Sequence, residues 1–146
     1  MDPAEVTTAL EAFDEGFNCA QAVLAAFAPR HGLTREQALK ISAAFGTGKT
    51  RAATCGAVSG ALMVIGLAHG RFRPDDMQAR ARTHALAQAF QDRFEKVHGA
   101  CTCEELLGLD PTTPEGRQAA IDRGLFESRC PVFVRSAVTL LLELAY

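Results

Sequence analysis

The chain has 146 residues, 48% of them hydrophobic, and a formal net charge of −2 at pH 7. This length fits one domain, residues 1–146, with enough apolar side chains for a core that needs no disulfide staples. The balanced charge predicts no nucleic-acid partner, because a protein that holds a phosphate backbone carries a basic excess.

The apolar stretches predict a soluble cytoplasmic protein with no membrane association. Residues 1–6 lack the basic region and apolar run of a signal peptide. The longest apolar stretch, residues 55–68, is shorter than the roughly 20 residues that cross a bilayer. In the cytoplasm cysteines stay reduced unless they are catalytic, redox-sensing or metal-bound.

Apolar residues recur at helical spacing along the whole chain, and no segment has the alternation of a strand. The expected fold is all-α, a single-domain bundle of about six to eight helices, several of them short. In chain order the expected helices cover residues 3–16, 18–27, 34–46, 55–68, 75–98, 103–107, 115–123 and 131–146.

Local signals support these helix starts and faces. Three capping boxes read Asn18-x-x-Gln21, Thr34-x-x-Gln37 and Thr102-x-x-Glu105. The longest helix is expected to bury one apolar side, made of Met77, Ala81, Leu86, Phe90, Phe94 and Val97.

Four of the five cysteines fall at expected helix N-termini. Cys19 follows Asn18, Cys55 follows Thr54, Cys103 follows Thr102, and Cys130 precedes Pro131, which would make Cys130 the cap itself. The first turn of a helix presents free N–H groups and the positive end of the dipole. This environment favours the thiolate, which is the form that attacks disulfides and binds metals.

The glycines behind Cys55 need an explanation, because each glycine inside a helix costs about 1 kcal/mol relative to alanine. Gly56 and Gly60 allow either the close approach of another backbone or the access of a cofactor or substrate to the sulfur. The cations Lys49 and Arg51 precede Cys55 and would favour its thiolate. We therefore expect Cys55 to be the principal thiolate and Gly56 and Gly60 to be candidate cofactor-binding positions.

The cysteine pattern resembles the C_GCAxxG_C_C family, which is labelled after four cysteines. The matching segments are GFNCAQAV at residues 16–23, CGAVSGALM at 55–63, FEK at 94–96, CEELLG at 103–108, and Cys130. The label writes Gly-Cys-Ala where this chain reads Cys-Gly-Ala, and Cys101 has no place in the pattern. The resemblance implies a helical protein with four functional cysteines and a redox role, without a defined substrate.

Two chemical functions and one plain alternative follow from these residues. In the first, Cys19, Cys55, Cys103 and Cys130 converge as catalytic thiols that exchange disulfides with an unknown redox partner. In the second, the same four thiolates are metal ligands, holding an iron–sulfur cluster or another metal in an electron-transfer or sensor protein. Four inert core thiols are the plain alternative, because free cysteine is often only packed.

The terminal helix, residues 132–146, is almost wholly apolar, so a homodimer across this helix is also compatible with either chemistry. Cys101 is expected to be an incidental extra cysteine, although a Cys-x-Cys pair with Cys103 can also bind a metal or resolve a disulfide.

Overall fold

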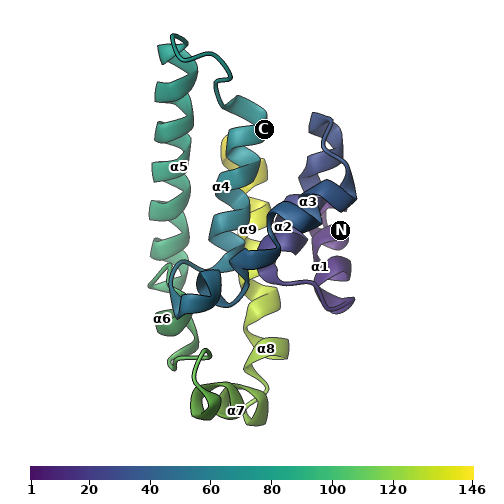
Figure 1. The fold of residues 1–146 in the computed structure, drawn as a ribbon, viewed down its shortest axis with the longest axis vertical. Coiled ribbons are helices and arrows are strands. Elements are labelled where there is room, and N and C mark those ends of the chain that lie inside the picture. The colour runs from purple at the N-terminus through teal and green to yellow at the C-terminus, as the bar shows by residue number, and fades with distance from the viewer.

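Helices account for nearly all regular structure in the computed structural model, which describes residues 1–146 (Figure 1). The nine α-helices are α1 (Ala4–Asp14), α2 (Cys19–Phe27), α3 (Arg35–Ile41), α4 (Gly56–His69), α5 (Met77–His98), α6 (Cys103–Leu107), α7 (Pro114–Asp122), α8 (Leu125–Ser128) and α9 (Cys130–Ala145). Short turns cover η1 (Ala28–His31), η2 (Ala43–Phe45) and η3 (Gly48–Ala52). There is no strand, only an isolated bridge between Thr54 and Thr102.

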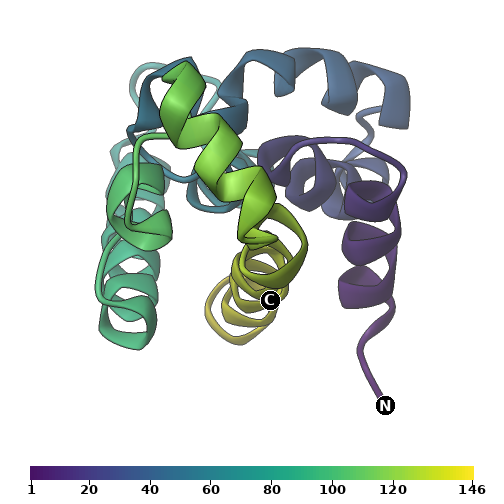
Figure 2. The same cartoon turned by 90° about the horizontal axis from the view of Figure 1, so that it is seen from below.

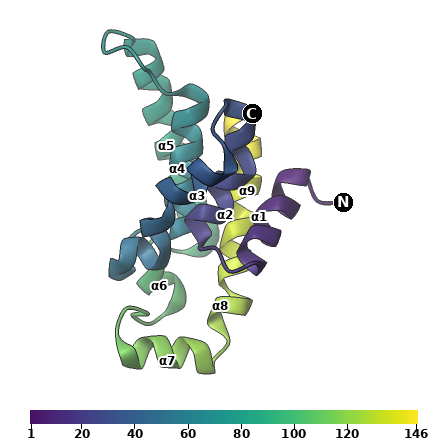
Figure 3. The same cartoon turned by 45° about the vertical axis from the view of Figure 1, so that its right-hand side comes forward.

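Helix α9 is the central element of the bundle. It packs against α1 and α2 on one side and against α4 and α5 on the other (Figures 1 and 2). Helix α3 lies against α2. Helix α7 lies at the end of the molecule opposite the C-terminus, where α8 joins it to α9 (Figures 1 and 3).

The core is filled by aromatic and branched side chains from these helices. Phe94 on α5 lies between Phe90 and Phe133, at ring-centroid distances of 6.1 and 6.3 Å. All three rings are buried. The apolar face of α9 is thus packed against other helices of the same chain. A homodimer through this helix stays a prediction, and its contacts would be made by the exposed side chains of α9.

Two of the expected capping boxes form in full. The Asn18 side chain accepts from the amide of Gln21, whose side chain accepts from the Asn18 amide, and Thr34 and Gln37 repeat the arrangement. Thr102 caps α6 by accepting from the amide of Glu105. These local signals predicted the starts of α2, α3 and α6 correctly.

The all-α class is confirmed, but the expected number of six to eight helices is too low. The short helix α8 was not predicted. Helix α3 ends at Ile41 rather than near Gly46, because Ser42 leaves the helical region and its hydroxyl donates to the Ala38 carbonyl at 2.7 Å.

The expected buried side of α5 is partly wrong. Phe90 and Phe94 are buried, but Met77 and Val97 are 57% and 62% exposed, and Ala81 is exposed as well. The residues in the first half of α5 are exposed or half-buried. No helix in the structure is both long and apolar enough to cross a membrane.

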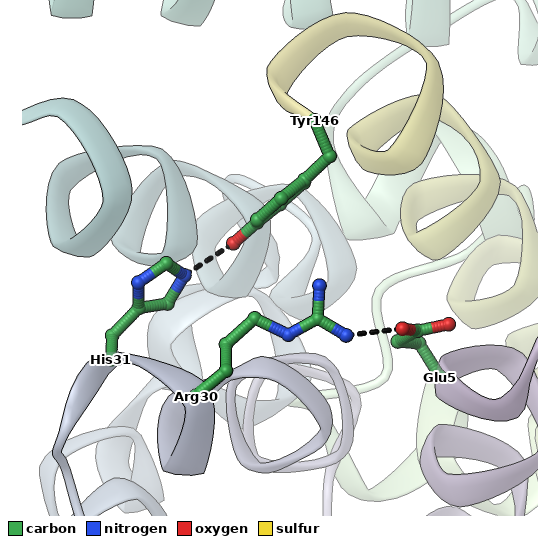
Figure 4. A network of polar contacts seen from close by, with 4 residues as sticks. All are labelled: Glu5, Arg30, His31 and Tyr146. Atoms are coloured by element: carbon green, nitrogen blue, oxygen red, sulfur yellow. Dashed lines mark hydrogen bonds and ion pairs between the residues drawn. The ribbon is translucent and has the colours of Figure 1, made fainter.

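A polar network fixes the C-terminal end of the chain to the first helices (Figure 4). The Tyr146 hydroxyl is hydrogen-bonded to His31 Nε2 at 2.5 Å, and its ring stacks on Phe27 at 5.3 Å. Arg30 forms an ion pair with Glu5 and lies over the Tyr146 ring, with Cζ 5.1 Å from the centroid. The C-terminus is therefore held at α1 and η1, far from the end at which α7 lies.

Replacing Asn18 by alanine is expected to lower the free energy of unfolding by about 1–2 kcal/mol, because the cap of α2 is lost. Asn18 also donates from Nδ2 to the Ala43 carbonyl at 3.1 Å. Urea denaturation measures the change. Asn18→Ser is the matched control, since it keeps a capping oxygen and, like alanine, lacks the Nδ2 donor, so it should recover part of the stability. Equal losses in both variants would contradict the capping role.

Candidate thiol site

Four of the five cysteines line one cavity of about 220 Å³. They come from four different helix starts: Cys19, Cys103 and Cys130 are the first residues of α2, α6 and α9, and Cys55 caps α4. The expectation that Cys130 is itself a cap is wrong by one residue, because Arg129 holds that position. The other lining residues are Phe13, Asn18, Thr47, Gly48, Gly56, Leu106, Leu107, Arg117, Phe126 and Phe133.

Backbone hydrogen bonds bring Cys55 and Cys103 together. The Cys55 amide donates to the Cys101 carbonyl at 2.8 Å, and the Cys103 amide donates to the Ala53 carbonyl at 2.7 Å. These bonds flank the Thr54–Thr102 bridge and hold the start of α4 beside the start of α6. The two sulfurs therefore enter the cavity from neighbouring positions.

The close approach of α2 to α4 places Cys19 at the same cavity. A Cβ added at Gly60 would lie 2.8 Å from the Ala20 carbonyl oxygen, and one added at Gly56 would lie 2.9 Å from the Ala20 nitrogen and 3.1 Å from Cys19 Cβ. Both glycines thus allow backbone contact between the helices. Gly56 also lines the cavity, whereas Gly60 does not.

Burial keeps two of the thiols protonated. The pKa of Cys55 is raised to about 11 and that of Cys103 to about 12, in both cases mainly by desolvation. The amides of Ala57 and Val58 lower the Cys55 pKa, but burial outweighs them, because Cys55 is only 4% exposed. Lys49 and Arg51 are exposed. The raised pKa does not favour the expectation that Cys55 is the principal thiolate, which stays a prediction.

An interaction between the thiols of Cys19 and Cys130 shifts their two pKa values in opposite directions. It raises the pKa of Cys19 well above its ordinary value and lowers the pKa of Cys130. Burial and the charge of Glu127 raise the Cys130 pKa and the charge of Arg129 lowers it, but the interaction with Cys19 is the largest effect. Within this pair the interaction favours the thiolate of Cys130 over that of Cys19.

Comparison with known proteins identifies the family of the chain. Residues 17–144 match the family described as "Putative redox-active protein (C_GCAxxG_C_C)". The chain belongs to the C_GCAxxG_C_C family. No curated protein and no solved structure gave a significant match.

The four cysteines of the C_GCAxxG_C_C label all reach the cavity, and the fifth does not. Cys101 lies outside the lining, and its thiol donates to the Gln91 carbonyl at 3.6 Å. Burial raises its pKa. Cys101 is therefore a suitable internal control for the family cysteines.

A strained loop forms part of the cavity wall. Four residues that are not glycine have positive φ between 54° and 64°: Thr47, Lys49, Thr50 and Ala52. Such backbone costs of the order of 1–3 kcal/mol per residue and persists only where the surroundings fix it. Here Gly48 packs against Ala53 and Cys103, where an added Cβ would lie 2.5 Å from the Ala53 nitrogen.

As metal ligands the cysteines are not pre-arranged. No group of three or more His, Cys, Asp or Glu side chains is placed so that it could hold a metal ion. Binding one would require the thiols to move together and to lose protons.

Sequence reasoning missed the side chains that complete the cavity. Cys130 and Phe133 are three residues apart on α9, so this spacing could have indicated that the ring accompanies the cysteine. Phe126 lies on the separate helix α8, which was not predicted. Arg117 on α7 gave no signal, because a single arginine in a polar helix resembles any solvated side chain.

Proposed function

We propose that the cavity carries out thiol–disulfide exchange, with Cys130 as the attacking thiolate and Cys19 as the resolving thiol. The observation that carries this proposal is that Cys19 and Cys130 meet at one cavity together with Cys55 and Cys103, and the interaction of the Cys19 and Cys130 thiols lowers the Cys130 pKa and raises that of Cys19. Thiolate, not thiol, attacks a disulfide, and the attacking sulfur is the one that ionises most readily.

The reaction proceeds in two balanced steps. The Cys130 thiolate attacks one sulfur of a substrate disulfide, forming a mixed disulfide and expelling the other sulfur as a thiolate, which takes a proton. Cys19 then loses its proton and attacks the Cys130 sulfur, which forms the Cys19–Cys130 disulfide and releases the second substrate thiol. Two electrons pass from the protein to the substrate, which is reduced to two thiols.

Cys55 and Cys103 do not start the exchange, because at neutral pH a pKa of about 11 or 12 leaves them almost wholly protonated. The partner that reduces the protein again is a second dithiol. A reducing cytoplasm, which the sequence predicts, would keep the thiols available for this cycle.

Disulfide mapping after limited oxidation tests the proposal. Reduced, metal-free protein is treated with one equivalent of a small neutral disulfide, quenched with acid and digested. We expect Cys19–Cys130 to be the first intramolecular disulfide and Cys101 to stay free. A first disulfide between Cys55 and Cys103 would contradict the assignment.

Metal analysis on protein purified without oxygen gives the second arm of the test. One metal ion or cluster per chain, with the four family thiols protected from alkylation, would replace thiol exchange with the metal function. Four titratable thiols without metal would support exchange.

A further inference from the structure

The cavity has one charged side chain in its lining, and this charge is unpaired. Arg117 forms no ion pair, and its guanidinium lies over the Phe126 ring, with Cζ 5.8 Å from the centroid. No aspartate or glutamate lines the cavity. The only formal charge in the lining is therefore positive, and the nearest carboxylates that act on the cysteines, Asp110 on Cys103 and Glu127 on Cys130, lie outside the lining.

Helix ends add to this polarity. Helices α2, α4 and α9 all start at the cavity, with Asn18, Cys55 and Cys130 in the lining. Each helix start carries a partial positive charge. The helices and the arginine thus favour an anion from several sides.

The remaining walls are apolar and the space is small. Apart from the cysteines, the hydrophobic lining residues are Phe13, Leu106, Leu107, Phe126 and Phe133. The cavity has a volume of about 220 Å³. This space fits a small molecule with an apolar body better than an extended peptide.

We infer that the cavity selects low-molecular-weight thiols and disulfides that carry a carboxylate, and that Arg117 is the residue that binds the carboxylate. This inference rests on the proposed thiol exchange, since the sulfur of the ligand would meet Cys130 while its anionic end meets Arg117. Arginine suits this role because its planar guanidinium matches a carboxylate with two parallel hydrogen bonds.

The position of Arg117 makes the residue open to substitution. It is exposed on α7, whose main contacts are with α8. Gly108 and Gly124, which flank this part of the chain, both have positive φ. Because the Arg117 side chain is exposed, replacing it removes its charge without opening a cavity in the core.

Paired alkylation with iodoacetate and iodoacetamide tests the inference. The two reagents have nearly the same size, but only iodoacetate carries a carboxylate; each is attacked by a thiolate, which forms a C–S bond and releases iodide. Rates at Cys130 are measured by peptide mass spectrometry in a Cys101→Ser background. We expect Arg117→Gln to lower the ratio of the iodoacetate rate to the iodoacetamide rate by about fivefold, the effect of one partly solvated charge.

Two matched variants control for structure and general charge. Arg117→Lys should retain most of the ratio, and Arg123→Gln, which removes a cation outside the cavity at the end of α7, should leave it unchanged. An unchanged ratio in Arg117→Gln, or an equal fall in Arg123→Gln, would overturn carboxylate binding while thiol exchange stands. Failure of iodoacetamide to react preferentially at Cys130 in the unsubstituted protein would overturn both.

Discussion

Replacing Gly60 by alanine is expected to lower the free energy of unfolding by about 1–3 kcal/mol, although alanine is the better helix former. The added methyl group would lie 2.8 Å from the Ala20 carbonyl oxygen and 3.1 Å from its Cα. These are backbone atoms, so α2 and α4 must move apart. Denaturant titration followed by circular dichroism measures the loss.

Gly66 supplies the matched control within the same helix. It is exposed, and an added Cβ would meet nothing within 4 Å. Gly66→Ala should therefore raise the free energy of unfolding by about 0.4–1 kcal/mol, because the unfolded chain loses conformational freedom. A rise in the free energy of unfolding in both variants would show that the α2–α4 contact is not as close as described.

The α2–α4 contact links stability to the thiol site. Ala20, which faces Gly60, is the residue after Cys19, and Cys19 reaches the cavity only because α2 lies directly on α4. Separating these helices moves one sulfur of the Cys19–Cys130 pair. The glycines allow backbone contact between the helices, which was one of the two explanations open from the sequence.

The sequence predicted the helix starts well because their signals are local. A cap such as Asn18 and its partner Gln21 lie three residues apart, and their hydrogen bonds form within one turn. The starts of α2, α3 and α6 follow from such pairs, and with them the placement of Cys19 and Cys103 at helix N-termini. No tertiary information is needed for this part of the fold.

Burial on α5 could not be predicted in the same way. Val97 and Phe94 are both apolar and lie on the same helix, yet Val97 is 62% exposed and Phe94 is buried. The difference arises because Phe133 of α9 lies against Phe94, at a centroid distance of 6.3 Å. Which side of a helix meets a partner depends on contacts between residues far apart in the chain.

Which cysteine ionises most readily also depends on contacts between residues far apart in the chain. Sequence reasoning favoured Cys55 from its neighbours, but the first effect on its pKa is desolvation by the whole fold. The pairing of Cys19 with Cys130 joins the first residue of α2 to the first residue of α9. Neither burial nor this pairing is encoded in the flanking residues.

Replacing Cys130 by serine is expected to slow reaction with a small neutral disulfide at pH 7 by at least about tenfold. A thiol with a pKa below 9 is more than about 1% thiolate at this pH, whereas a pKa of about 11 leaves about 0.01%. The greater nucleophilicity of the more basic sulfurs recovers about one order of magnitude of this difference. Stopped-flow measurement of thiol release gives the rate, and Cys101→Ser, which alters a cysteine outside the cavity, should leave it unchanged.

Removing Cys19 should leave the attack but change its pH dependence. In the unsubstituted protein the rate rises with pH and levels off above the lowered pKa of Cys130. Cys19→Ala removes the hydrogen-bond donor that is the main cause of this lowering, so the midpoint should move to higher pH and the rate at pH 7 should fall. The mixed disulfide at Cys130 should also accumulate, because its resolving thiol is gone. A midpoint that stays in place, or moves to lower pH, would show that Cys19 does not stabilise the Cys130 thiolate.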